Sequence, residues 1–359
     1  MLEKEKISLR QFSVLALHFT VGTTVLIGPS GLAAVAKQDG WLAGIVGLCA
    51  NLLSVLLYSA LGNRFPDKTF AEYTELLLGK WLGKAVSLLF FSYIFLLTAF
   101  LLRVLGNFLT THIMPETPIE AILIVFVCLV VLAVRLGLET ISRAAEMFLP
   151  LIVFLFLFLV AFLTPQIKTV NLLPVFEEGA GPVLLASFYF FSLQELVVLL
   201  MLFPYANRTL KARKAWLQGV AIGGMMLVII TALSILVLGP DLTARDLYPS
   251  FELAKRINVA NFLQRVEAAL AILWLVTIFF KTAVCFYAGA LTLAQTLQLK
   301  DYRPLTFPLA MIAVVLSIVV YHSIVDFLEF VPKVWSVYAM TYIAVIPLIL
   351  LMTAAVRKK

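Results

Sequence analysis

The chain has 359 residues, of which 62% are hydrophobic and 13% are charged, and its formal net charge is +7 at pH 7. A water-soluble globule of this size needs more polar surface, so the composition excludes a soluble protein and indicates an integral membrane protein. In a soluble protein the positive charge would suggest nucleic-acid binding. Here the basic residues lie in short loops between apolar runs, where they orient the chain in the bilayer, and we expect no nucleic-acid partner.

The apolar runs predict an all-α integral membrane fold with about ten transmembrane helices, because a spanning helix needs about 20 mostly apolar residues. No run shows the period-2 alternation of a barrel strand. The remaining segments are too short for a second domain, so residues 1–359 are predicted to form a single membrane domain. In chain order, the predicted spans 1 to 10 are roughly 11–36, 41–63, 83–111, 119–137, 145–164, 182–204, 215–238, 263–297, 305–323 and 333–356.

The segments between the spans give the expected orientation. Most Lys and Arg residues fall on one side of the membrane when the N-terminus is placed in the cytoplasm, so both termini are predicted to be cytoplasmic. This agrees with an even number of spans. The longest outer segment, roughly 239–262, is predicted to be either a short interfacial helix or a solvated loop.

Span 1 reads "FTVGTTVLIGPSGLAA" and contains weak helix formers at the depth where a helix should be continuous. Gly22, Thr23 and Thr24 are followed by the Gly-Pro-Ser-Gly run at 28–31, which includes a residue without an N–H group. We expect this segment to be unwound and to face protein or a wet cavity, since lipid cannot satisfy free backbone groups. A kinked but continuous helix is the alternative.

Three spans have polar residues at the same predicted depth. The centre of span 1 falls near Thr23 and Thr24, that of span 6 in "FYFFSLQEL", and that of span 8 near Lys281. Interruptions in spans 1 and 6 are typical of a five-plus-five inverted repeat with a binding site at the membrane midplane. The predicted half-repeats are about 11–164 and 182–356.

Charged side chains at the bilayer centre are costly, by about 2.5–3.5 kcal/mol each on insertion scales, so they usually face the bundle interior and have a partner. Arg103, Glu195 and Lys281 are the three candidates, and Asn107 lies one turn beyond Arg103 on the same face. In one interpretation, Glu195 pairs with Arg103 or Lys281 only to hold the bundle together. In the other, one of the charges is a gate or a proton-exchanging group beside a small zwitterionic ligand. A buried lysine can exchange its proton and an arginine cannot, which favours Lys281.

Residue patterns typical of catalysis or metal binding are not found in the sequence. Cys49, Cys128 and Cys285 lie within apolar spans without paired spacing, and we interpret them as packing residues. A catalytic serine or cysteine would need a base that the spans do not offer, and no Walker loop or HExxH pattern occurs. We therefore expect no catalytic residues, no metal and no cofactor.

Three stretches carry a resemblance to a known family: "ISLRQFSVLALHFTVGTTVLIGPSGLAAVAKQDGWLAGIV", "LLRVLGNFLTTHIMPETP" and "FYFFSLQELVVLLMLFPYANR". The GT…P…DGW arrangement in the first is the most specific. In these stretches, and over essentially its whole length, the chain resembles the spore germination permeases, the B subunits of endospore nutrient germinant receptors. That family is similar in turn to the amino acid-polyamine-organocation transporters, whose fold is a five-plus-five inverted repeat with broken spans 1 and 6.

The resemblance implies a receptor subunit in the inner membrane of a dormant spore, which binds a small amino acid as germinant and acts through A and C subunits. Matched by position, it implies ligand contacts from Gly22, Thr23, Thr24, Phe191, Ser192, Thr282 and Phe286. In sodium-coupled relatives a cation lies between spans 1 and 8, where Lys281 would place its ammonium group instead. Proton-linked relatives use a lysine in span 5, which this chain lacks, so their proton coupling is not carried over.

Two other functions fit the same fold and pocket. One is a self-sufficient proton-coupled amino acid transporter, and the other is a membrane scaffold with a vestigial pocket. A pocket of Phe, Ser and Thr side chains favours a small apolar amino acid, although one side chain is enough to alter such a preference. The identity of the germinant therefore stays open.

Overall fold

The computed structural model describes residues 6–207, 209–256, 266–321, 326–327 and 330–357. Regular structure in these residues is helical, apart from one isolated β-bridge between Ile7 and Ala206. The long helices are α1 (Leu9–Val21), α2 (Thr24–Ala36), α3 (Gly40–Arg64), α5 (Lys80–Phe108), α6 (Ile119–Arg135), α7 (Leu138–Leu163), α8 (Ala180–Ser192), α9 (Thr209–Leu238), α12 (Glu267–Thr296), α13 (Thr306–Val319) and α16 (Ile346–Val356). The predicted all-α class is confirmed.

Short helices complete the fold. They are α4 (Phe70–Leu78), α10 (Pro240–Arg245), α11 (Pro249–Lys255) and α15 (Ser336–Met340), the 3-10 helices η1 (Lys37–Asp39), η3 (Thr164–Gln166), η4 (Thr169–Leu172), η5 (Leu196–Met201), η6 (Phe203–Tyr205) and η7 (Arg303–Leu305), and the π-helices η2 (Leu109–Ile113), η8 (Val331–Trp335) and η9 (Thr341–Val345). Helices α10 and α11 fall in the outer segment 239–262, so the helical alternative holds for its described part. The rest of that segment lies outside the described residues.

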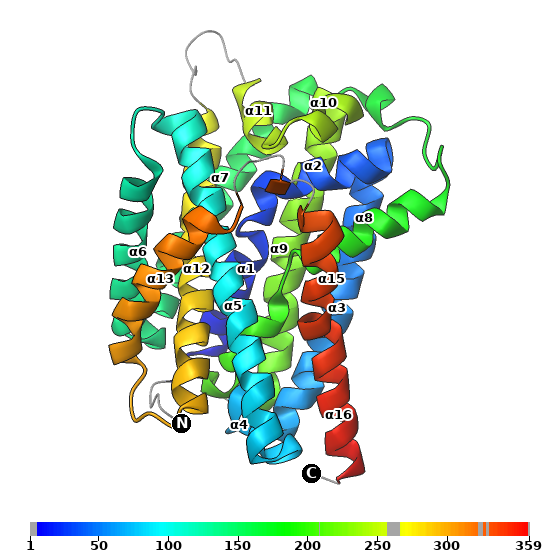
Figure 1. Cartoon of the computed structure of the whole chain (residues 1–359). Coiled ribbons are helices and arrows are strands. Elements are labelled where there is room, and N and C mark those ends of the chain that lie inside the picture. The colour runs from blue at the N-terminus through cyan, green and yellow to red at the C-terminus, as the bar shows by residue number, and fades with distance from the viewer. Residues whose placement is uncertain (1–5, 208, 257–265, 322–325, 328–329, 358–359) are drawn as a thin grey trace.

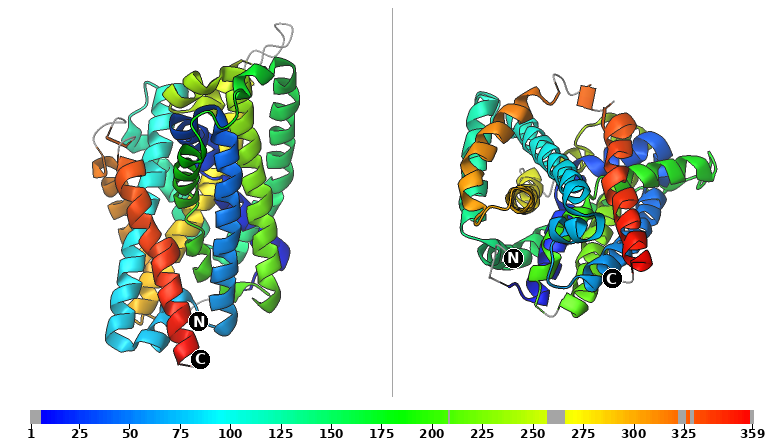
Figure 2. Two further views of the ribbon diagram at one scale, coloured as in Figure 1. Left: turned by 90° about the vertical axis from the view of Figure 1, so that its right-hand side faces the viewer. Right: turned by 60° about the horizontal axis from the view of Figure 1, so that its bottom comes forward.

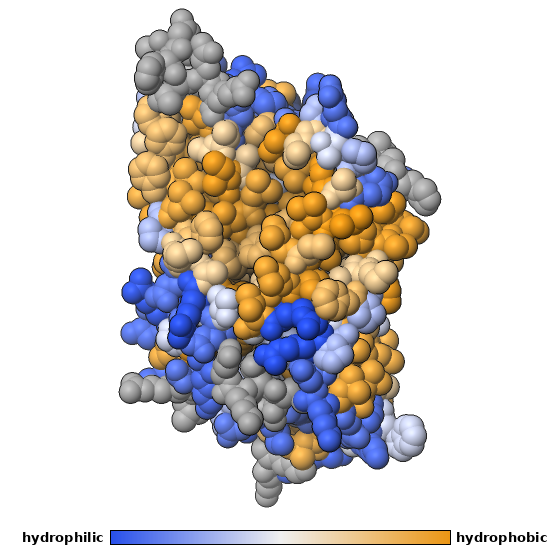
Figure 3. Space-filling model, turned by 90° about the vertical axis from the view of Figure 1, so that its left-hand side faces the viewer, coloured by the Kyte–Doolittle hydropathy of each residue, from blue (hydrophilic) through white to orange (hydrophobic). Residues whose placement is uncertain are grey.

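Each predicted span contains helix within the described residues, and seven helical stretches there are long and apolar enough to cross a membrane. The space-filling view shows a broad hydrophobic zone bordered by hydrophilic surface (Figure 3). Outward-facing side chains such as Leu129, Leu157 and Met311 are more than half exposed, as lipid contact requires. The chain is therefore a multi-pass membrane protein, while the count of ten spans and the inverted repeat stay predictions.

The helices stand side by side as one bundle, with α1 and α12 in its interior (Figures 1 and 2). Helix α1 packs against α9, α12 and α7, and α12 packs against α5, α1 and α7. Every residue from Phe280 to Thr292 in α12 is buried, which explains why that helix is apolar on all sides. The start of α1 and the end of α16 lie at the same end of the bundle (Figure 1), which we call the inner end because both termini are predicted to be cytoplasmic.

Span 1 is interrupted at the weak helix formers Gly22 and Thr23, as the sequence predicted. Helix α1 ends at Val21 and α2 begins at Thr24, so the continuous-helix alternative is wrong. The second part of the expectation is also wrong, because Pro29 lies inside α2. Proline cannot donate to the carbonyl four residues before it, that of Val25, but the Ser250 hydroxyl donates to this carbonyl over 2.7 Å. A neighbouring helix thus replaces the missing hydrogen bond.

Span 6 is interrupted at a corresponding place. Helix α8 ends at Ser192, Leu193 and Gln194 leave the helix, and the chain continues as the 3-10 helix η5. Glu195 adopts a left-handed conformation with φ of 44°, which is rare for a residue with a side chain of this size and costs about 1–3 kcal/mol. Such a conformation persists only where the surroundings fix it.

The two interrupted spans are joined at their inner ends. The Ile7 amide donates to the Tyr205 carbonyl over 2.9 Å, and the Asn207 amide donates to the Ile7 carbonyl over 2.8 Å. These bonds form the β-bridge between the strand-like residues ahead of α1 and those after η6. The N-terminal segment is therefore attached to the end of span 6 before it enters the bundle.

Candidate functional site

A buried ion pair lies between the interruptions of spans 1 and 6. The Lys281 ammonium on α12 donates to Glu195 Oε2 over 2.8 Å and to the Leu193 carbonyl over 3.2 Å, and the two side chains are only 1% and 3% exposed. The Trp335 indole N–H donates to the other carboxylate oxygen, Glu195 Oε1, over 3.4 Å. Of the two partners that the sequence allowed for Glu195, the structure selects Lys281. A pair so well supplied with hydrogen bonds meets the condition under which buried charges are retained.

Gly22 makes room for this pair. A Cβ atom at Gly22 would lie 2.5 Å from Lys281 Cδ, closer than real Cβ atoms approach other heavy atoms. The lysine stem thus passes directly over the backbone of the span 1 interruption. Its ammonium lies 5.1 Å from the centre of the Phe19 ring, a cation–π distance. Span 1 therefore positions Lys281 through a missing side chain and an aromatic face.

The two interruptions also contact each other through polar side chains. The Gln194 amide N–H donates to the Thr24 hydroxyl over 3.3 Å. Thr23 and Thr24 stand at the N-terminus of α2, where the first backbone N–H groups of a helix have no partner within the helix. These groups and the helix dipole favour a negative charge.

A small cavity of about 40 Å³ lies between these groups. Its polar lining comes from Thr23, Thr24 and Glu195, and its apolar lining comes mainly from α5 and η8, with Leu97, Phe100, Leu101, Val104, Val331 and Trp335. This space holds a few water molecules, whereas pockets for small-molecule ligands begin at about 300 Å³. An amino acid therefore requires these side chains to move apart.

A larger outer cavity of about 530 Å³ adjoins the central one. The two share Ile27, Phe327 and Val331 in their walls, and Tyr189, Arg245 and Lys333 line the outer cavity alone. These shared residues form the boundary between the central cavity and the outer cavity.

Several predicted ligand contacts lie near the ion pair without lining the central cavity. Ser192 Oγ is 2.8 Å from both the Tyr189 carbonyl and Ser336 Oγ, so it joins α8 to α15. Phe191 is half-buried, Phe286 is fully buried within α12, and the Thr282 hydroxyl is buried with no hydrogen-bond partner among the described residues. Their role in ligand binding stays a prediction.

Arg103 and Asn107 form a separate group on α5. The Arg103 guanidinium lies 5.2 Å from the centre of the Tyr321 ring, and the Asn107 amide donates to the Tyr321 hydroxyl over 3.0 Å. This group joins α5 to the end of span 9. The structure therefore does not bring Arg103 to Glu195.

Sequence reasoning missed the contributions of Trp335 and Phe100. The centres of their rings lie 4.9 Å apart in an edge-to-face arrangement, and both side chains line the central cavity. Trp335 lies in "FVPKVWSVY", where its neighbours Pro332 and Lys333 suggest the end of a span and not a residue that lines the central cavity. The π-helix η8 turns this indole inward.

The chain matches the family model described as spore germination protein over residues 6–354. It is 29% identical to spore germination protein KB of Bacillus subtilis (strain 168), over 100% of this chain and 97% of that protein. It is also 29% identical to the putative spore germination protein YfkT of the same strain, over 83% and 82%, and 25% identical to spore germination protein GerLB of Bacillus cereus, over 80% and 78%.

Two solved transporter structures share the fold. MhsT in complex with L-phenylalanine superposes with a TM-score of 0.70 at 15% identity, over 99% of both chains. Mhp1, a nucleobase-cation-symport-1 family transporter, superposes with a TM-score of 0.69 at 12% identity, over 95% of this chain and 78% of that one. The chain therefore has a transporter fold.

Proposed function

Because the chain belongs to the spore germination protein family, we propose that it is the B subunit of a nutrient germinant receptor in the spore inner membrane. It binds a small amino acid at the centre of the bundle and passes a conformational signal to A and C subunits. Both termini are cytoplasmic, and the chain is not an enzyme. The observation that carries the proposal is that Glu195, held by Lys281, lines the same cavity as the N-terminus of α2.

The two ends of a zwitterionic ligand have complementary groups in this cavity. The ligand carboxylate accepts from the free N–H groups at Thr23 and Thr24, where the helix dipole favours it. The ligand ammonium faces the Glu195 carboxylate. Its side chain lies among Leu97, Leu101 and other apolar residues, which favours a small apolar amino acid.

Ligand entry would proceed from the outer cavity. Ile27, Phe327 and Val331 must move to join the two cavities, and Val331 and Trp335 are the ends of η8. A ligand that separates them therefore displaces span 10. We propose this displacement as the signal that reaches the partner subunits.

A binding experiment on the purified chain tests the ligand site. Labelled L-alanine or L-valine is expected to bind, and Val104→Phe is expected to abolish binding because it fills the cavity. Leu129→Phe is the matched control, since Leu129 is 52% exposed on the outer surface. If Val104→Phe keeps its thermal unfolding temperature and also its ligand affinity, the central site is refuted.

An uptake experiment separates a receptor from a transporter. In proteoliposomes of the isolated chain we expect labelled amino acid to bind without sustained accumulation inside the vesicles. Sustained uptake would favour a self-sufficient transporter. No ligand-dependent thermal shift with any amino acid would favour a scaffold instead.

A further inference from the structure

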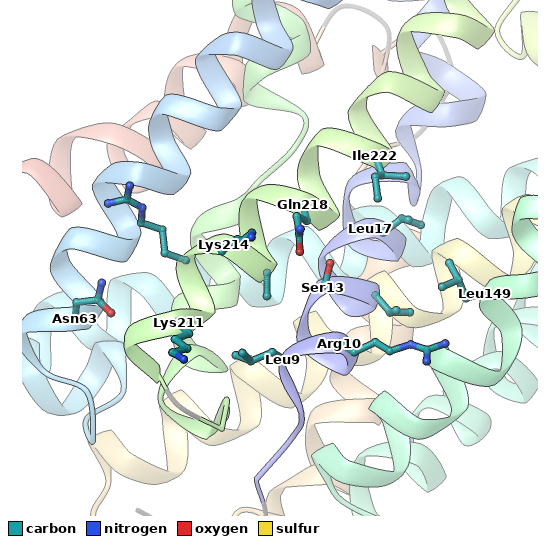
Figure 4. A pocket seen from close by; sticks show the side chains of 13 residues that line it. Leu9, Arg10, Ser13, Leu17, Asn63, Leu149, Lys211, Lys214, Gln218 and Ile222 are labelled. Carbon is teal, nitrogen blue, oxygen red and sulfur yellow. The ribbon is translucent and has the colours of Figure 1, made fainter.

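A third cavity, of about 630 Å³, opens at the inner end of the bundle, between the start of α9, the outward face of α1 and α7 (Figure 4). The proposed function does not use it. Its lining includes Arg10 on α1 and Lys211, Arg213 and Lys214 on α9. Within the described part of the chain, no Asp or Glu lines the cavity. The cavity therefore has a strongly positive entrance.

Most of this positive charge is uncompensated. Arg10 forms an ion pair of 2.9 Å with Glu146. Among the described residues, no ion pair is formed by Lys211, Arg213 or Lys214, and all three are exposed. Three adjacent cations without acidic partners attract an anion.

The walls change from basic to apolar along the depth of the membrane. On α9, Lys211 and Lys214 are followed on the same face by Gln218 and Ile222. At a rise of 1.5 Å per residue, Ile222 lies about 16 Å farther along the helix axis than Lys211. On α1, Arg10 and Ser13 are followed by Leu17, and Figure 4 shows this row beside the row on α9, with the Arg10 side chain directed toward α7. Ile222 is 53% exposed, so the deep end opens toward lipid.

This order of charge and depth matches an amphiphile. A soluble anion would use only the basic entrance, whereas a phospholipid would also use the apolar wall beneath it. Basic pockets between membrane helices on the cytoplasmic side bind anionic lipid headgroups. We propose that this cavity binds an anionic phospholipid, with its phosphate at Lys211 and Lys214 and an acyl chain along Leu17 and Ile222.

The test measures phosphatidylglycerol binding to the full-length chain by native mass spectrometry, with phosphatidylcholine and inorganic phosphate as comparisons. Each basic residue near an anionic headgroup contributes about 1 kcal/mol, or about fivefold in affinity. Lys211→Gln/Lys214→Gln is therefore expected to weaken phosphatidylglycerol binding about thirtyfold. Glutamine keeps the helix propensity of lysine, so the fold is retained.

The matched control is Lys68→Gln/Lys80→Gln, which removes the same charge from exposed residues outside the cavity. Its expected effect is less than about fivefold, the contribution of one charge. Ile222→Ser, which shortens the apolar wall, is expected to weaken phosphatidylglycerol binding and to leave phosphate binding unchanged.

Three outcomes would overturn the proposal. Equal losses in the two double variants would mean that the lysines act only through general surface charge. Full competition by inorganic phosphate, together with no effect of Ile222→Ser, would indicate a free-anion site. Oligomerisation of the lipid-free chain that depends on Lys211 and Lys214 would assign the cavity to a protein partner.

Discussion

Replacing Lys281 by methionine tests the central ion pair most directly. The substitution keeps an unbranched side chain of similar length and removes the ammonium that donates to Glu195 and to the Leu193 carbonyl. The carboxylate is then left 3% exposed with only the Trp335 hydrogen bond. Breaking a buried pair on one side costs about 3–5 kcal/mol. We expect the free energy of unfolding to fall by that amount.

A double variant separates the pair from its surroundings. In Lys281→Met/Glu195→Gln no unpaired charge remains, and the glutamine oxygen still accepts from the Trp335 indole N–H. We expect it to recover at least about 2 kcal/mol of the loss, because removing both charges of a buried pair is often close to neutral. Coupling of this size is typical of side chains in contact.

The assay is equilibrium unfolding in mixed micelles, followed by helicity, combined with binding of labelled amino acid. Lys80→Met, at an exposed residue of the inner end, is the control and should change stability by less than about 0.5 kcal/mol. A single variant as stable as the parent, or a double variant no better than the single one, would refute the ion pair. A folded double variant that does not bind ligand would show that the charges serve the site as well as the fold.

Three further substitutions have defined expectations. Gly22→Ala should lower the free energy of unfolding by about 1–3 kcal/mol in the same assay, because its Cβ would overlap the Lys281 side chain. Gly289→Ala is the control and should be tolerated, since a Cβ there would lie 3.5 Å from its nearest neighbouring atom. Equal effects of the two variants would contradict the close approach of Lys281 to Gly22. Tyr321→Phe should lower the free energy of unfolding by about 0.5–1.5 kcal/mol through the lost hydrogen bond from Asn107. It should leave amino acid affinity unchanged, since the ring that packs against the cavity-lining Phe100 and Phe327 is kept; an altered affinity would connect the Tyr321 hydroxyl to the ligand site. Trp335→Phe should lower ligand affinity more than stability, because the indole lines the cavity and donates to Glu195. Binding and unfolding are measured on the same sample. A loss of stability with unchanged affinity would mean that Trp335 contributes only to packing.

The sequence predicted a common depth for Glu195 and Lys281, and left open whether Lys281 or Arg103 pairs with Glu195, because depth changes almost linearly along a helix whereas direction does not show in the count. Counting residues from the ends of spans 6 and 8 places Glu195 and Lys281 near one level, and the 2.8 Å between Lys281 Nζ and Glu195 Oε2 shows that the two side chains meet. The same counting also placed Arg103 near that level, and it could not show that this side chain faces Tyr321. Depth is read from one helix, whereas direction around the axis depends on the neighbouring helices.

Other features depend on contacts between distant segments, which no local pattern reveals. Pro29 remains within a helix because Ser250, 221 residues farther along the chain, donates to the Val25 carbonyl. The π-helix that ends at Trp335 has no clear sequence signal. The left-handed Glu195 is likewise fixed by its partners and not by a glycine. These are the positions at which local propensity and tertiary structure disagree, and they surround the candidate site.

The β-bridge between Ile7 and Ala206 has a mechanical consequence. Force applied to the residues directly ahead of α1 reaches the inner end of span 6 through two backbone hydrogen bonds, without passing through the middle of the bundle. Helix α1 and the segment of span 6 that follows its interruption are thus expected to move as one unit. An N-terminal fusion or a neighbouring polypeptide that binds the residues directly ahead of α1 would therefore move α1 and the end of span 6 together. It would also oppose a ligand that separates these two segments.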